Sequence, residues 1–213
     1  MPLTNPEIWS TVLAERRRLA EDLDPIDDSG WNAPSLCPGW SVHDVLAHLV
    51  DTARTGKAAF VLAMIRAGGD FDRANDAGVQ KYRQADPRGT LAAFREAADL
   101  KRTPPASPAT RLVEAIVHGE DIRRPLGLAG DYPAAAVSDA LEYQLRTKVS
   151  FGGGKERAEG LRLVASDSGS TWGDGPEVSG SGLDLLVAVS GRPVDAARFT
   201  GAGAARFAEL TGS

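Results

Sequence analysis

Two short segments of the chain carry side chains that could hold a metal ion. In the first, RLVEAIVHGEDIRR, the residues Glu114, His118 and Asp121 follow one another at spacings of four and three. On a helix these side chains share one stripe about 60° wide. The other positions of the segment are mostly apolar, which is typical of a buried helix. Its polar stripe therefore needs a partner or a metal ion, because burying an unpaired charge is costly.

The second segment, SVHDVLAHLVDT, contains two of the three histidines. On a helix, His48 lies at the edge of the apolar face and can point into the interior of a bundle. His43 lies nearly opposite, in the first turn, so it is the weaker candidate. Asp44 precedes His48 by one turn, where it can orient the imidazole ring or cap the helix.

Together, His48, Glu114 and His118 supply two imidazoles and one carboxylate. With a fourth position open, this is the ligand set of a catalytic zinc or a non-haem iron, and the interior of a helix bundle is a usual place for it. The spacing leaves an alternative open, in which Glu114 and His118 form an ion pair and His48 is a hydrogen-bonded core residue. Asp121 is expected to pair with Arg124 or to orient a ligand rather than to bind the metal.

The first 150 residues have the periodicity of helices, which would position these side chains. The pattern predicts five helices, over 7–23, 41–67, 89–101, about 109–124, and from Pro133 to the glycines at 152–154. Ser41, with Asp44 three residues later, resembles a capping box that begins the second helix.

After the glycines the pattern changes to short strands and helices. Alternating residues in GLRLVASDS predict a strand, and TWGDGPEVSG predicts a second strand interrupted by Gly-Pro. SGLDLLVAVSGR and the segment 202–210 read as short helices. The chain is therefore expected to be of the α+β class, with a helix bundle over 1–152 and a small α+β domain over 158–213.

Composition and charge exclude other classes of protein. The chain has 213 residues, one cysteine and a net charge of −5. A single cysteine excludes an internal disulfide framework and any zinc site with two or more thiolates, and Cys37 is expected to be a small buried side chain. The acidic balance argues against a nucleic-acid partner, and no apolar stretch approaches the roughly 18–20 residues that span a bilayer. Because the first ten residues lack the pattern of a secretory signal, a cytoplasmic protein is expected.

The sequence also resembles a known family of proteins. The segments CPGWSVHDVLAHLV and VEAIVHGEDIRRPLG resemble the mycothiol-dependent maleylpyruvate isomerase family, within the DinB-like four-helix-bundle superfamily. The tail, LRLVASDSGSTWGDGPEVSGSGLDLLVAVSGRP, is similar to the small C-terminal α+β domain of that family. The resemblance implies an up-down four-helix bundle in which His48, Glu114 and His118 bind a divalent metal, typically zinc, with Asp44 and Asp121 at most orienting the ligands.

The resemblance also implies a chemistry based on a thiol. Coordination to a metal deprotonates a thiol, so mycothiol would serve as an activated thiolate that isomerises a small electrophile or is transferred to it. Mycothiol is made by actinobacteria, and 19 of the 24 basic residues are arginine, a bias that fits a GC-rich genome. The competing hypothesis is a non-catalytic metal-binding bundle with a regulatory or stress-related role. The expected partners are a small-molecule thiol and a small electrophile, with no nucleic acid and no membrane, for a monomer or homodimer.

Overall fold

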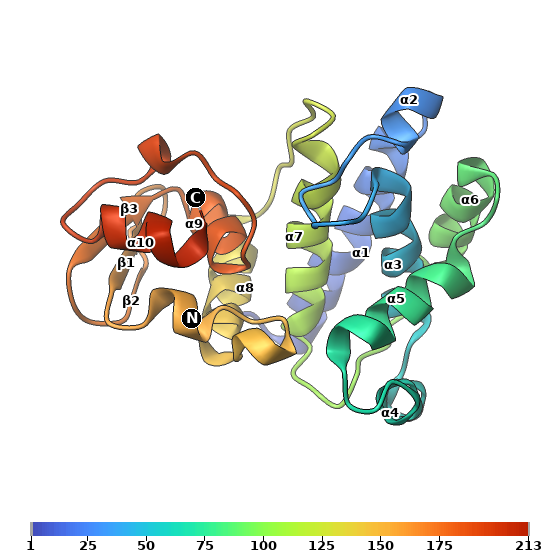
Figure 1. Ribbon diagram of the computed structural model, residues 1–213, viewed down its shortest axis with the longest axis horizontal. Helices are drawn as coiled ribbons and strands as arrows, with labels where there is room; N and C mark the ends of the chain where they lie inside the picture. Colours follow the sequence, from blue (N-terminus) through green and yellow to red (C-terminus); the bar gives the residue numbers. More distant parts are fainter. Residues whose placement is uncertain (1, 213) are drawn as a thin grey trace. The chain divides into compact units, whose positions relative to one another are not determined.

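The computed structural model describes residues 2–212, which fall into two compact units. The first is Thr4–Asp131, and the second comprises the residues from Tyr132 onward together with residues 2 and 3. The elements of both units are labelled in Figure 1. The α+β class expected from the sequence is confirmed, because a helix bundle is followed by a unit that contains a small sheet.

The first unit is entirely helical. Its helices are α1 (Asn5–Asp22), α2 (Asp28–Trp31), α3 (Val42–Arg54), α4 (Lys57–Arg66), α5 (Phe71–Tyr82), α6 (Pro87–Ala97) and α7 (Thr110–Arg123). Helices α1 and α3 each pack against both α6 and α7, so these four helices form the bundle core, and α5 packs on the outside of α3. The core is filled by large apolar side chains from several helices, among them Leu19, Leu46, Leu91, Phe94 and Ile122. Burying each of them contributes roughly 1.5–3 kcal/mol.

The start of α3 is the capping box that the sequence predicts. The Ser41 hydroxyl accepts a hydrogen bond from the backbone N–H of Asp44 at 3.2 Å, and the Asp44 carboxylate accepts one from the N–H of Ser41 at 2.9 Å. Two of the backbone N–H groups at this end of the helix are thereby satisfied. Because the cap determines where α3 begins, it also determines the position of His48 along the helix axis.

Replacing Ser41 with alanine is expected to lower the free energy of unfolding by about 1 kcal/mol, because the N–H of Asp44 loses its acceptor. Urea denaturation followed by circular dichroism measures the change. The matched control is Thr4→Ala in the exposed capping box of α1, where solvent can replace the cap and the loss should be smaller. Equal losses in the two variants would contradict this explanation.

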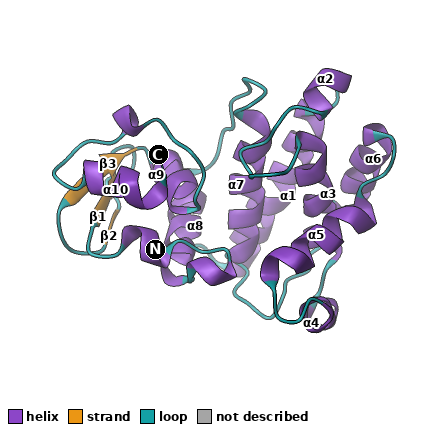
Figure 2. Ribbon diagram, viewed as in Figure 1, coloured by secondary structure: helices purple, strands orange, loops and turns teal. Residues whose placement is uncertain are grey.

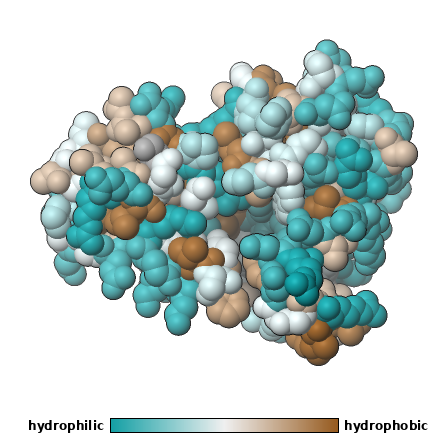
Figure 3. All heavy atoms as spheres, viewed as in Figure 1, coloured by the Kyte–Doolittle hydropathy of each residue, from teal (hydrophilic) through white to brown (hydrophobic). Residues whose placement is uncertain are grey.

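The single helix predicted over 41–67 is wrong. Helix α3 ends at Arg54, Thr55 and Gly56 adopt extended conformations, and α4 begins at Lys57. A β-branched residue followed by glycine is a weak point in a helix, because both have low helix propensity. No residue of α4 is buried, and Val61, Leu62 and Ile65 are exposed. Figure 3 shows the resulting apolar surface at the lower edge, where Figure 1 places α4.

Helix α5 is absent from the sequence prediction. Its N-cap is Asp70, whose carboxylate accepts a hydrogen bond from the N–H of Arg73 at 3.0 Å. The aspartate after the pair Gly68-Gly69 was a usable signal for a helix start. Only Gly78 and Val79 of this helix are buried, so its apolar periodicity is weak.

The second unit consists of a long helix, a small sheet and two short helices. Its elements are α8 (Ala134–Arg146), η1 (Val149–Phe151), η2 (Lys155–Ala158), β1 (Arg162–Ala165), β2 (Thr171–Trp172), β3 (Glu177–Gly180), α9 (Gly182–Val189), η3 (Ala196–Arg198) and α10 (Ala204–Thr211). The strand order is β2-β1-β3, with β1 antiparallel to β2 and parallel to β3. Figure 2 shows the three strands in orange. The interrupted strand predicted over 171–180 is therefore two strands on opposite sides of β1, whereas the strand and helices predicted around it are present.

The division between the two units differs from the predicted boundary near residue 152. Helix α8 packs against α9 and belongs to the second unit. The glycines that suggested a linker lie within this unit and allow close backbone contacts. A Cβ on Gly153 would lie 2.0 Å from the carbonyl oxygen of Thr147, and one on Gly154 would lie 2.2 Å from that of Val189. The glycine run is therefore required by packing.

None of the helices within residues 2–212 combines the length and the apolar character needed to cross a membrane.

Candidate metal centre

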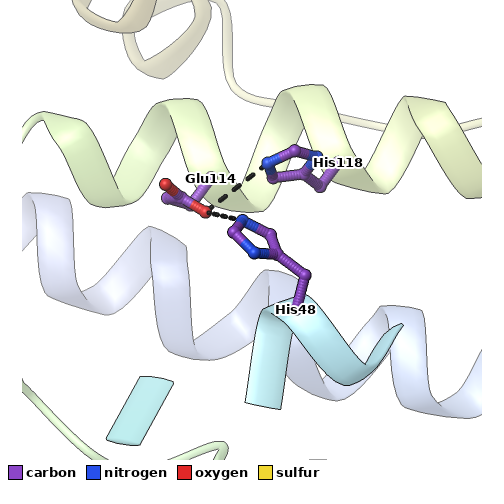
Figure 4. Close-up of side chains that lie close together, drawn as sticks. All are labelled: His48, Glu114 and His118. Atoms are coloured by element: carbon purple, nitrogen blue, oxygen red, sulfur yellow. Dashed lines mark ion pairs between the residues drawn. The ribbon is translucent and has the colours of Figure 1, made fainter. Parts of the chain in front are cut away.

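The three predicted ligands come together from two packed helices. His48 extends from α3, and Glu114 and His118 extend from neighbouring turns of α7 (Figure 4). Nε2 of His48 lies 3.3 Å from Oε2 of Glu114, and Nε2 of His118 lies 3.6 Å from the same oxygen. One ligand atom from each residue lies within 4.8 Å of the other two. The arrangement is therefore compact enough for all three to reach one ion.

The three side chains are mostly withdrawn from solvent. The exposed fractions are 4% for His48, 13% for His118 and 20% for Glu114. Oε2 of Glu114 and Nδ1 of His48 are buried, and neither has a hydrogen-bond partner among the described residues. A buried carboxylate oxygen that faces two ring nitrogens without a hydrogen bond is the environment that a bound cation would satisfy. The residues present thus fit a divalent metal ion.

The protonation states suit metal binding. Burial lowers the pKa of the His118 imidazole and outweighs the opposite effect of its hydrogen bond to Asp121. Burial would raise the pKa of Glu114, but contact with His48 and the charges of His118 and Arg111 hold it well below its ordinary value. Metal ligands must be neutral imidazole and ionised carboxylate, and these directions favour both forms.

Asp121 orients one of the imidazoles. Its Oδ2 lies 2.8 Å from Nδ1 of His118, and the aspartate side chain is fully buried. A carboxylate on one ring nitrogen turns the other toward a metal and fixes the tautomer. Asp121 therefore contacts one of the predicted ligands, as its orienting role requires. Arg124 pairs with Glu120 at 2.7 Å.

An Asp121→Asn variant is expected to bind metal roughly 10–100-fold more weakly, because the His118 ring loses the carboxylate that orients it and raises its basicity. Titration of the metal-loaded protein with a competing chelator measures the affinity. At saturating metal the variant should still bind the wild-type number of ions. An unchanged affinity would show that the carboxylate does not act through His118.

Asp44 does not hold the ring of His48, so that part of its predicted role is wrong. Oδ2 of Asp44 accepts from Ser41, while Oδ1 pairs with Nε of Arg83 at 2.7 Å. The ring of His48 packs instead against Trp40, with ring centroids 5.1 Å apart. The indole N–H of Trp40 donates to Asp76 at 3.1 Å. Asp76 belongs to α5 and Arg83 caps its end, so the unpredicted helix determines both contacts.

His43 is the bystander that helical phase predicts. Its Nε2 lies 2.8 Å from the hydroxyl of Thr90, and the side chain is buried. Burial lowers the pKa of the His43 imidazole. The residue is therefore a hydrogen-bonded core histidine outside the candidate centre.

Two buried arginines behind Glu114 were missed by sequence reasoning. Arg111 donates to the carbonyl of Thr52 at 3.1 Å, and Arg16 donates to that of Leu100 at 2.9 Å. Both border a cavity of about 10 Å³ that Glu114 also lines, which is about the space of one water molecule. Burial, together with the charge of Arg111, lowers the pKa of Arg16 to about 10. The placement of Arg111 on the stripe of Glu114, three residues earlier, was the available signal.

The fold and the site together define a helix-bundle protein with a candidate divalent-metal centre in its interior, followed by a small α+β unit. Residues 12–102 match the family model described as mycothiol maleylpyruvate isomerase N-terminal domain. This stretch is therefore similar to the N-terminal domain of that family, and the resemblance seen in the sequence is confirmed. The matched range includes His48 and ends before Glu114.

Two solved structures share the fold. They are crystal structures of a mycothiol-dependent maleylpyruvate isomerase and of a histidine-to-alanine variant of it. In both comparisons the TM-score is 0.66 at 18% sequence identity, over 95% of this chain and 94% of that chain. No curated protein matches the chain.

Proposed function

We propose that this chain is a divalent-metal-dependent enzyme that uses mycothiol to isomerise a small electrophile or to transfer sulfur to it. The family domain indicates a thiol-dependent isomerase. The convergence of two imidazole nitrogens and a carboxylate oxygen within 4.8 Å supports the metal. That convergence is the single observation that carries the proposal, because the three side chains meet inside a helix bundle whose N-terminal part matches the model of this family.

His48, Glu114 and His118 would hold the metal ion. Two nitrogens and one oxygen suit zinc, and three protein ligands leave a position for a further ligand, as in catalytic zinc sites. When bound, the cation lowers the pKa of a coordinated thiol, so that mycothiol supplies a nucleophilic sulfur for reversible addition to a double bond or for S-transfer.

The surrounding residues prepare these ligands. Asp121 holds Nδ1 of His118, so that Nε2 faces the carboxylate of Glu114. The positive charge of Arg111 favours the ionised form of Glu114. Trp40 covers the ring of His48 and so limits the access of water to the buried imidazole.

The test is turnover of mycothiol by the metal-loaded protein with maleylpyruvate and with a panel of other small electrophiles. We expect either trans product without net thiol consumption or consumption of thiol with formation of a thioether. Glu114→Gln should lose this activity. Lys148→Met, which alters an exposed residue of the second unit, should keep it.

The second candidate function is a non-catalytic metal-binding protein with a regulatory or stress-related role. Metal binding without turnover of any electrophile in the panel would favour this alternative and contradict the enzyme.

If the chain uses mycothiol, we expect it to be a cytoplasmic protein of an actinobacterium, in agreement with its arginine-rich composition.

A further inference from the structure

The second unit contains a pocket of its own. It has a volume of about 360 Å³, and all the residues that line it lie between Glu142 and Asp174. Pockets of roughly 300 Å³ and above are the size that takes small organic ligands. None of its lining residues contributes to the candidate metal centre, so the pocket is a separate site.

One wall of the pocket is apolar. Leu161 and Leu163 come from the start of the sheet, Leu145 comes from α8, and Trp172 comes from the edge strand β2. Leu163 and Trp172 are directly paired across the two strands, so their side chains lie on the same face of the sheet. Trp172 is only partly buried, which leaves aromatic surface available to a ligand.

Glycines hold the mouth of the pocket in place. Gly173 has a φ of 74°, and a Cβ there would lie 2.4 Å from the carbonyl oxygen of Leu161. Gly175 has a φ of 133°, and a Cβ there would lie 2.4 Å from the carbonyl oxygen of Gly160. The turn can approach the backbone so closely only because side chains are absent. Trp172 and Asp174 are thereby held at the pocket on a tightly packed turn.

The rim carries charges of both signs. Arg146 and Glu142 form an ion pair with each other. The side chains of Lys155, Glu159 and Asp174 also line the pocket. Within residues 2–212, no hydrogen bond or ion pair occupies the charged groups of these three side chains. One cation and two anions therefore remain beside the apolar wall.

We propose that this pocket binds a small zwitterion with a large apolar side chain, namely a free amino acid of the phenylalanine type. The apolar group packs on Trp172 and the leucines, the carboxylate faces Lys155, and the ammonium faces Glu159 and Asp174. These three rim residues are exposed, so their charges select a ligand by electrostatic complementarity. A zwitterion complements both signs of charge, whereas a singly charged ligand complements only one.

Three probes with the same ring and chain length test the charge requirement. L-phenylalanine carries both charged groups, 3-phenylpropionate carries only the carboxylate, and phenethylamine carries only the ammonium. Ligand-observed NMR and calorimetry on the full chain should show that phenylalanine binds about two- to fivefold more tightly than either of the others.

Two conservative variants separate the parts of the rim. Lys155→Met keeps the aliphatic stem at an exposed position and should weaken the binding of phenylalanine and phenylpropionate about two- to fivefold, with phenethylamine unaffected. Asp174→Asn should weaken phenylalanine and phenethylamine instead. Lys148→Met, an exposed lysine of the same unit that does not line the pocket, is the matched control and should bind all three as the wild type does.

A further measurement separates this site from the metal centre. Metal-free protein and a His48→Ala variant should bind phenylalanine like the wild type. The proposal for this pocket therefore stands even if the proposed thiol-dependent activity is not found. The proposal is overturned if none of the probes binds at millimolar concentrations. It is also overturned if phenylpropionate binds as tightly as phenylalanine, or if Lys155→Met has no effect.

Discussion

A His48→Ala variant is expected to lose its metal, with an affinity on the order of 10²-fold or more below that of the wild type. Outer partners of metal ligands already contribute about 10–100-fold, and a direct ligand contributes more. Only Glu114 and His118, both on α7, would remain. Purification without chelator, followed by elemental analysis of both proteins, measures the ratio of metal to protein.

His43→Ala is the matched control, since it removes another buried histidine of the same helix. It should keep its metal and lose about 1–3 kcal/mol of unfolding free energy, because the buried hydroxyl of Thr90 keeps the N–H of Gln84 but loses its hydrogen bond to the ring. A metal-free wild type, or undiminished metal in His48→Ala, would refute the site. Equal loss of metal in both variants would show that damage to the bundle, rather than loss of a ligand, explains the result.

Arg123→Met is expected to cost about 3–5 kcal/mol of unfolding free energy, the largest effect on stability that the structure predicts. Arg123 and Glu15 form an ion pair in which each side chain is only 2% exposed. Arg123 also pairs with Asp22 at 2.7 Å. Methionine preserves much of the side-chain volume but leaves the carboxylate of Glu15 buried, with Arg18 as its remaining ion-pair partner within residues 2–212.

The control for this variant is Arg17→Met. Arg17 pairs with Asp99 on the surface, where the side chains are 59% and 70% exposed. Exposed pairs of this kind contribute little, so we expect a change within about 0.5 kcal/mol. Urea denaturation at neutral pH compares the two, and similar effects would contradict the importance of burial.

The effect of Arg123→Met should depend on pH. Burial raises the pKa of Glu15 in the folded protein, even though Arg123 and Arg18 oppose it. Loss of Arg123 raises this pKa further. A carboxyl with a raised folded-state pKa stabilises the fold when protonated, and that contribution is lost as the pH rises through the folded-state pKa. The deficit of the variant should therefore shrink between pH 7 and pH 5, and a deficit that grows would contradict the assignment.

The sequence predicted the stripe of α7 because helical periodicity is a local property. The spacing of Glu114, His118 and Asp121 places them on one face wherever the helix lies. The capping box at Ser41 was also predictable, because its two hydrogen bonds join residues three apart. Local patterns likewise predicted the strand β1 and the helix α9.

The break at Thr55-Gly56 and the helix α5 were missed because local signals there are weak. The low helix propensity of Thr55 and Gly56 did not outweigh the apolar residues that follow them, up to Ile65. The place of α8 in the second unit depends on its packing against α9, a contact between segments far apart in the sequence. The glycines at 152–154 look like a linker until the neighbouring backbone is known.

By itself, therefore, the sequence determined the residue types of the candidate site and the faces on which they lie, together with the family they resemble. Only the tertiary structure decided which atoms meet. From the sequence, Asp44 could equally have capped α3 or held His48. In the structure Arg83, at the end of α5, pairs with the carboxylate of Asp44, and Asp44 caps α3. Arg16 and Arg111 lie 95 residues apart in the chain, yet the packing of α1 on α7 places both beside Glu114. Such long-range contacts depend on how helices pack, which the periodicity of a single helix does not specify.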